Sequence, residues 1–179
     1  FAGLNADGSS VGSLAALARS GDLLIGTRTA MDIELAASNG LTLLRTDGLL
    51  TQREGRIGVQ GSRIVLESGA SAGIGRANAP VLITLVNEGT LSARGAGDIF
   101  IASQSADVAI ESIFATGRVT LGSAGAITDS VGSGAPRIVS NGLTILGASI
   151  GTADRFLGYE TTSTATSNLQ SEGAMFVET

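Results

Sequence analysis

Apolar and polar residues alternate along much of this chain in short stretches. This period of two is typical of strands with one buried face, and residues 41–43, 119–121 and 143–145 show it most clearly. Glycine and asparagine separate the stretches, as at 39–40 and 141–142, because both residues tolerate tight corners with positive φ. The pattern predicts strands over residues 23–27, 41–44, 56–59, 63–66, 81–86, 99–102, 118–121, 137–139, 143–146 and 174–178.

Helical signals are poor by comparison. Only residues 11–19 could form one or two helical turns, after the possible caps Ser9 and Ser10. The same stretch also fits a strand that includes Leu17, and we favour the strand slightly. Without helical crossovers, a doubly wound α/β fold is excluded.

A long internal repeat organises these strands. Residues 21–25 recur at 97–101 and again at 173–177, with a spacing of 76 both times. A fixed period of this kind indicates stacked units that cannot bury their apolar faces alone. We therefore divide the chain into residues 1–20 (the end of a preceding coil or a cap), 21–96 (first unit), 97–172 (second unit) and 173–179 (start of a further unit), all in one continuous solenoid.

The repeat continues between these markers, where residues 33–34 match 110–111, 48–51 match 125–128 and 74–77 match 150–153. Division of the period by four gives about 19 residues, within the range of known coil repeats. We expect a right-handed parallel β-helix with 19–20 residues per coil, four coils per unit and eight to nine coils in the chain, stacked about 4.8 Å apart. The expected inward ladder residues are Ile25, Leu44, Leu50, Ile64, Ile101, Leu121, Ile127 and Ile145.

Composition supports a thin aliphatic core and narrows the partners. The chain has 43% hydrophobic residues but only 3% aromatic residues, with 26 glycines and a net charge of −5. Its eleven basic residues are all arginines, scattered from Arg19 to Arg155, which argues against nucleic-acid binding. The longest apolar run, 79–86, is far short of the roughly 20 residues that span a bilayer. No signal peptide is visible at Phe1, and we expect the chain to be part of a larger protein.

Several catalytic and metal motifs fail for lack of a partner residue. Residues 8–12 fit the Gly-x-Ser-x-Gly elbow, but the chain has no histidine to complete a triad. The absence of cysteine and histidine makes zinc improbable, and the absence of lysine excludes a P-loop. Residues 95–98 come nearest to a calcium loop and are read as a turn. We therefore expect no cofactor, metal or catalytic residue.

Carboxylate chemistry was weighed as well, because β-helices host polysaccharide hydrolases that pair two acids and lyases that use a Lys or Arg base with calcium. The aspartates are dispersed, although a pair across stacked coils stays open, and Arg118 and Arg137 are read as solvated side chains. The Thr-rich run at 161–167 suggests an ice-binding array, but Thr-x-Thr recurs only at 27–29, so we expect an exposed strand or loop. The four aspartates considered are Asp22, Asp98, Asp107 and Asp129.

The second unit carries a family resemblance in residues 97–101, 119–121, 125–129, 141–145, 150–151 and 173–178. In these residues the chain resembles the large repetitive exoproteins of Gram-negative bacteria related to filamentous haemagglutinin. The resemblance implies an exported, right-handed parallel β-helix used for adhesion, biofilm formation or contact-dependent functions. It transfers no functional residue, and the family's N-terminal secretion domain is not recognisable here.

The expected function is therefore a structural or adhesive β-helical segment of a large secreted or cell-surface fibrous protein, associated with the bacterial outer membrane. The alternative is a self-assembling subunit of an extracellular filament, sheath or surface layer. A carbohydrate-active β-helix enzyme is the third reading. Expected partners are neighbouring repeats or copies of the chain paired end to end, and host or cell-surface glycans or proteins. Nucleic acid and a membrane span are not expected.

Overall fold

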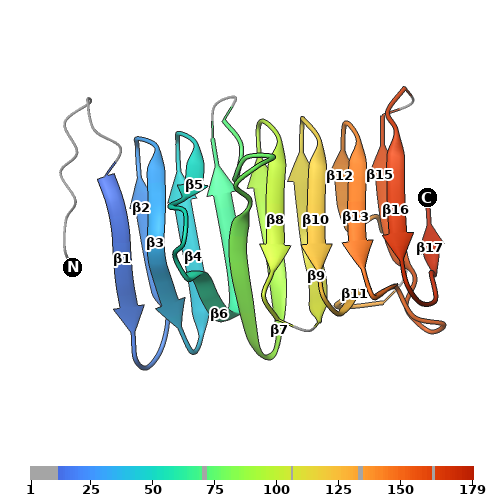
Figure 1. The fold of residues 1–179 in the computed structure, drawn as a ribbon, viewed down its shortest axis with the longest axis horizontal. Helices are drawn as coiled ribbons and strands as arrows, with labels where there is room; N and C mark the ends of the chain where they lie inside the picture. Colours follow the sequence, from blue (N-terminus) through green and yellow to red (C-terminus); the bar gives the residue numbers. More distant parts are fainter. Residues whose placement is uncertain (1–11, 70–71, 106, 133–134, 163) are drawn as a thin grey trace.

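The computed structural model describes residues 12–69, 72–105, 107–132, 135–162 and 164–179. Within these ranges the protein is all-β, without helix, and its strands stack side by side along one axis (Figure 1). The strands are β1 (Gly12–Ala18), β2 (Leu23–Thr27), β3 (Met31–Ser38), β4 (Leu41–Thr46), β5 (Leu50–Gln52), β6 (Gly58–Ser68), β7 (Val81–Gly95), β8 (Ile99–Ser103), β9 (Val108–Ala115), β10 (Val119–Ser123), β11 (Ala126–Asp129), β12 (Ile138–Ser140), β13 (Leu143–Gly147), β14 (Ser149–Ile150), β15 (Leu157–Thr161), β16 (Ser167–Ser171) and β17 (Val177–Glu178).

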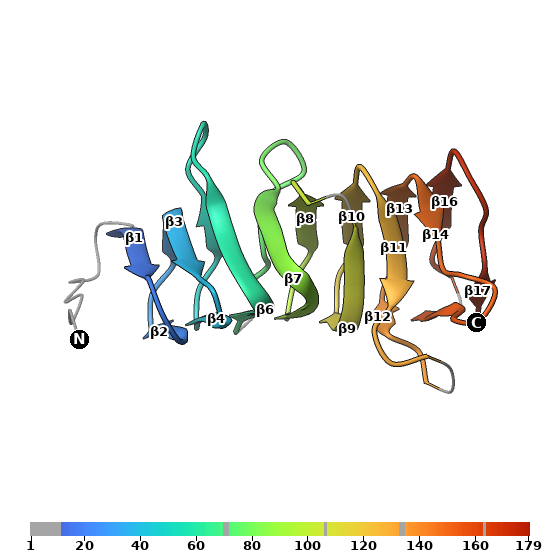
Figure 2. The ribbon, with the colours of Figure 1, turned by 90° about the horizontal axis from the view of Figure 1, so that it is seen from below.

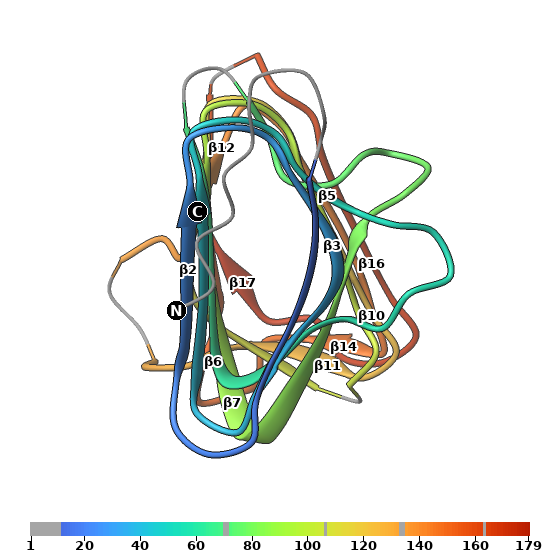
Figure 3. The same cartoon turned by 90° about the vertical axis from the view of Figure 1, so that its left-hand side faces the viewer.

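All pairings between these named strands are parallel, and each joins one coil to the next. The result is a β-solenoid of about eight turns, which Figures 1 and 3 show winding in a right-handed sense. The predicted fold class is thus confirmed. Strand β1 settles residues 12–18 as a strand rather than a helix. The strand predicted at 56–59 begins later, at Gly58, whose φ of 85° ends the preceding loop.

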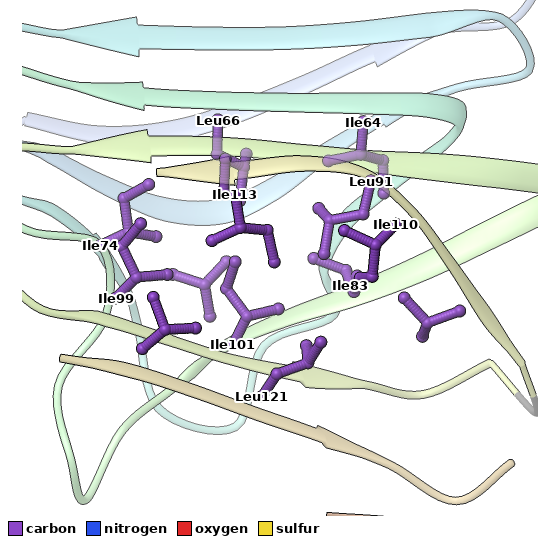
Figure 4. Packing of buried hydrophobic residues seen from close by; sticks show 14 of the residues in the cluster. Ile64, Leu66, Ile74, Ile83, Leu91, Ile99, Ile101, Ile110, Ile113 and Leu121 are labelled. Carbon is purple, nitrogen blue, oxygen red and sulfur yellow. The ribbon is translucent and has the colours of Figure 1, made fainter. Parts of the chain in front are cut away.

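The core consists of aliphatic ladders that run along the solenoid axis (Figure 4). Leu44, for example, lies between Ile25 of the preceding coil and Leu66 of the following one. Each buried aliphatic side chain contributes about 1.5–3 kcal/mol, which compensates for the scarcity of aromatic residues. Of the eight predicted inward residues, seven are buried, and Ile25 is half-buried against the same core.

The coil length differs from the expected 19–20 residues. Leu23 pairs with Thr42, which pairs with Ile64, which pairs with Leu91, so successive coils take 19, 22 and 27 residues. In the second unit the corresponding chain of partners gives coils of 20, 24 and 24 residues, from Ile99 through Val119 and Leu143 to Ser167. The prediction holds only for the first coil of each unit, because later coils carry loops that leave the stack.

The expectation of four coils per unit is also wrong. Leu23 to Leu91 and Ile99 to Ser167 both span three coils and 68 positions. Eight more residues then carry the chain round one corner, to Ile99 and Met175 respectively, where Ile99 pairs with Ile74 and Met175 with Ile150. A period of 76 is therefore three coils plus one side.

Because of this extra side, each unit begins one side further round the solenoid. Strand β2 lies on the left in Figure 3, whereas β10, which stacks on β8 of the second unit, lies on the right. The loop that follows β5 and the segment that follows β11 accordingly project from opposite sides (Figure 2). Equivalent residues of the two units therefore face different directions.

Candidate functional site: bulges and corners that hold the charged residues

Two β-bulges place glutamates at equivalent points of the two units. Leu14 pairs with Ile33 but Ala15 pairs with Leu35, which leaves Glu34 as the extra residue. The pairing of β7 with β9 slips in the same way, from Leu91↔Ile110 to Ser92↔Ser112, which leaves Glu111 unpaired. A bulge turns its extra side chain away from the regular alternation. This explains the matched Ile-Glu pairs in the sequence.

Arginines bind both bulge glutamates. Arg53 Nη1 donates to Glu34 Oε1 at 2.7 Å. Arg63 binds Glu111 through two bonds, Nε to Oε2 at 2.8 Å and Nη2 to Oε1 at 2.5 Å, and Thr90 Oγ1 donates to Oε2 at 3.3 Å. Hydrogen bonds from the arginines hold the pKa of each carboxyl below its usual value. Both glutamates therefore act as ties between coils.

Aspartates at the corners tie one coil to the next through the backbone. Asp22 Oδ1 accepts from the amide of Leu41 at 2.8 Å, and Asp98 Oδ1 accepts from the amide of Arg118 at 2.7 Å. These two bonds are equivalent in the two units, and the third marker has Ala174 in place of the aspartate. Asp107 Oδ1 accepts from Ala126 N at 2.8 Å at another corner.

The fourth aspartate organises a lateral loop. The Asp129 side chain is 1% exposed, and its Oδ1 accepts from the amides of Val131 and Gly132 at 2.8 and 3.1 Å. Arg137 Nε donates to both carboxylate oxygens at 3.0–3.1 Å. Arg137 is thus engaged in this pair rather than solvated as expected. Such a buried pair holds the loop in place because either partner alone would be costly to bury.

Gln52 takes the equivalent position in the first unit, and sequence reasoning missed it. Its Nε2 donates to Arg56 O at 2.8 Å, while its Oε1 accepts from Leu82 N at 2.6 Å. Ile33 pairs with Gln52 as Ile110 pairs with Asp129. The signal was available, because both polar residues end a predicted apolar stretch immediately before a loop.

These contacts define what the arrangement can do chemically. Each of the four aspartates weighed above serves a different corner or loop, bound to backbone amides or to an arginine. Within the described ranges, no group of three or more acidic, histidine or cysteine side chains could hold a metal ion. Residues 8–11 of the Gly-x-Ser-x-Gly motif lie outside the described residues. In the Thr-rich run, Thr161 ends β15 and Ser167 begins β16, with exposed Thr162, Thr164 and Thr166 between them.

One open groove follows three stacked corners of the second unit. Its volume is about 410 Å³, and the only charged side chain in its lining is that of Glu172. Small residues form its walls because the corners turn at Gly147 and alanines. Its lining residues are Ser123, Ala124, Leu146, Gly147, Ala148, Gln170, Ser171 and Glu172.

Comparisons with protein-family models, curated proteins and solved structures find no match for this chain. No helix in the described part of the chain is long and apolar enough to cross a membrane. The charged residues of the bulges and corners thus point to stacking, and the chain is a β-solenoid on the evidence of its own pairing.

Proposed function

We propose that the chain is a non-catalytic structural segment of a large secreted or cell-surface fibrous protein, with an adhesive role on its outer faces. The single observation that carries the proposal is the use of the carboxylates. Glu111 and Asp98, for example, bind groups of other coils rather than pairing around an open cleft. The side chains that an enzyme would devote to chemistry are used here for stacking.

The geometry suits a spacer. Parallel coils about 4.8 Å apart give an extended body whose length grows with the number of coils. Outward residues do not take part in the core ladders, so they are available for contacts with glycans or proteins. The cysteine-free composition and the resemblance to exported exoproteins support an extracellular location at the bacterial outer membrane.

A second candidate is a self-assembling subunit of a filament, sheath or surface layer. Strand β16 favours it, because within the described residues this strand pairs only with β13. Open strand edges accept further strands. The two candidates differ in whether the next coil belongs to the same chain or to another copy.

Antibody labelling of the producing cells tests the location. An antibody raised against the folded chain should label intact cells or secreted fibres, and labelling only after permeabilisation would contradict the proposal. In parallel, the purified chain is incubated with neutral and anionic polysaccharides. No new reducing ends and no unsaturated products are expected, and turnover of any of these polymers would favour the enzyme reading instead.

A further inference from the structure

The two ends of the described solenoid present related strand edges. At one end β1 pairs with β3 and β2 with β4, and at the other β16 pairs with β13 and β17 with β15. Among the described residues none of these four terminal strands has a partner on its outer side. Each end therefore offers a row of backbone amides and carbonyls to another strand.

The repeat relates these two ends to each other. Leu14 pairs with Ile33 as Leu91 pairs with Ile110, so β1 and the end of β7 are equivalent. The end of β7 is in turn equivalent to β16, because each is the last of three stacked coils in its unit. The path from β1 to β2 thus turns through the same corner as the path from β16 to β17. If β1 stacks on β16, β2 comes to lie over the segment that contains β17.

Charge distinguishes the two ends. Residues 164–179 contain Glu172 and Glu178 but no arginine, whereas residues 12–30 contain Arg19, Arg28 and a single acid. Arg19 and Glu172 are both exposed, and both lie in the corner just before a marker glycine. In the stacking described above, the two opposite charges meet at one corner.

We propose that the C-terminal coil of one copy stacks on the N-terminal coil of a second copy, β16 against β1, with Glu172 facing Arg19. The proposal rests on the structural function proposed above and names its partner as another copy of this chain. The contact continues the parallel pairing already present between coils. Because it joins two different surfaces and does not close, repetition generates a filament.

Charge reversal tests the contact. Sedimentation velocity at rising concentration, in about 20 mM salt, should show head-to-tail oligomers that weaken in about 0.5 M salt. Arg19→Glu and Glu172→Arg should each weaken association about three- to tenfold, since a surface pair contributes up to about 1 kcal/mol and reversal adds repulsion. The double variant should restore it. Arg76→Glu, which makes the same charge change as Arg19→Glu in a turn away from both ends, is the matched control.

An edge variant tests the backbone part of the contact. Leu143 N donates to Thr166 O, so in a parallel ladder the amide of Ser167 faces away from β13, toward the open edge. Proline is tolerated at the first residue of a strand, so Ser167→Pro should abolish association while the melting temperature is retained. If this variant loses its folded circular dichroism spectrum, the charge-reversal series decides alone.

The outcomes separate this inference from the proposed function. A strictly monomeric chain at every concentration, equal weakening by Arg76→Glu, or a double variant that stays weak would each overturn the inference. If cells are labelled only after permeabilisation but the charge series behaves as expected, the surface function fails and the head-to-tail contact stands.

Discussion

The two units of this solenoid agree in their interior. Their inward residues match in chemistry and in pairing, and even single corner bonds recur. The amide of Gly75 donates to Leu50 O at 2.7 Å, and that of Gly151 donates to Ile127 O at the same distance. The matched inward pairs are Leu23 with Ile99, Leu44 with Leu121, Leu50 with Ile127 and Ile74 with Ile150.

The same two units differ on their outer surface. On the first, Arg45, Glu67 and Arg94 form one outward row, with Arg45 3.7 Å from Glu67 and Arg94 5.5 Å from the ring centre of Phe114. The equivalent row of the second unit is Gly122, Leu146 and Gln170, without charge. Packing constrains the inside, whereas solvent accepts many side chains. The repeat is therefore a property of the core, and any difference in contacts between units belongs to the surface.

The largest expected effect comes from charging the shared interior. Leu50→Asp and Ile127→Asp bury an unpaired carboxylate at equivalent ladder positions, and each should cost several kcal/mol. Thermal unfolding followed by circular dichroism measures the loss, with Thr144→Asp on the outer face as a control near zero. A variant that kept the wild-type melting temperature would show that its side chain faces solvent.

Replacement of the corner glycines should come next. Gly75 and Gly151 have φ of 70° and 68°, and a Cβ at either would contact the carbonyl of Phe100 or Phe176. We expect Gly75→Ala to cost about 2–4 kcal/mol through strain and overpacking. Gly151→Ala should cost less, because Phe176 lies in the last coil and can shift. Gly122→Ala, where a Cβ meets open space, is the control, and equal losses at 75 and 151 would contradict this view of the end.

Removal of a corner aspartate should have a smaller effect. Asp22→Ala and Asp98→Ala each delete one acceptor for an amide of the next coil, for about 1 kcal/mol each in urea unfolding. Ala174→Asp adds the missing carboxylate where the described chain has no following coil, so no gain is expected. A clear gain in the dilute, monomeric protein would show that this corner already has a partner.

The smallest effect concerns acid. The pKa of Glu111 is lowered in the folded state by Arg63, so its contribution to stability is full above the usual pKa of about 4.5 and is lost as pH falls through the lowered value. Because the pair is partly solvated, that contribution stays below about 1 kcal/mol. The free energy of unfolding of Glu111→Gln should therefore fall less steeply below pH 5 than that of the wild type. Parallel pH profiles would contradict this role of Glu111.

Much of the fold could be predicted from local pattern. Strands such as β2 and β13 were found because alternation and flanking glycines are local signals, and the buried positions followed from the same alternation. The number of coils per unit could not be predicted this way. It depends on how many residues leave the stack, as in the loops between β5 and β6 and within β7, and nothing local distinguishes such a loop from a corner.

Site residues show the same division. The Ile-Glu repeat at 33–34 and 110–111 was visible in the sequence, but its meaning as a bulge needs the partner strand. The bond between Arg63 and Glu111 joins residues 48 positions apart, a distance over which no pattern is expressed.

The sequence alone thus determined that this chain is an all-β, repeating, aliphatic-cored protein, because burial of one face fixes residue types two by two along each strand. Only the tertiary structure decided that the repeat is three coils plus one side, and hence which way each unit faces. That decision rests on parallel hydrogen bonding between coils, which depends on the total length of each turn and not on the residues within any one strand.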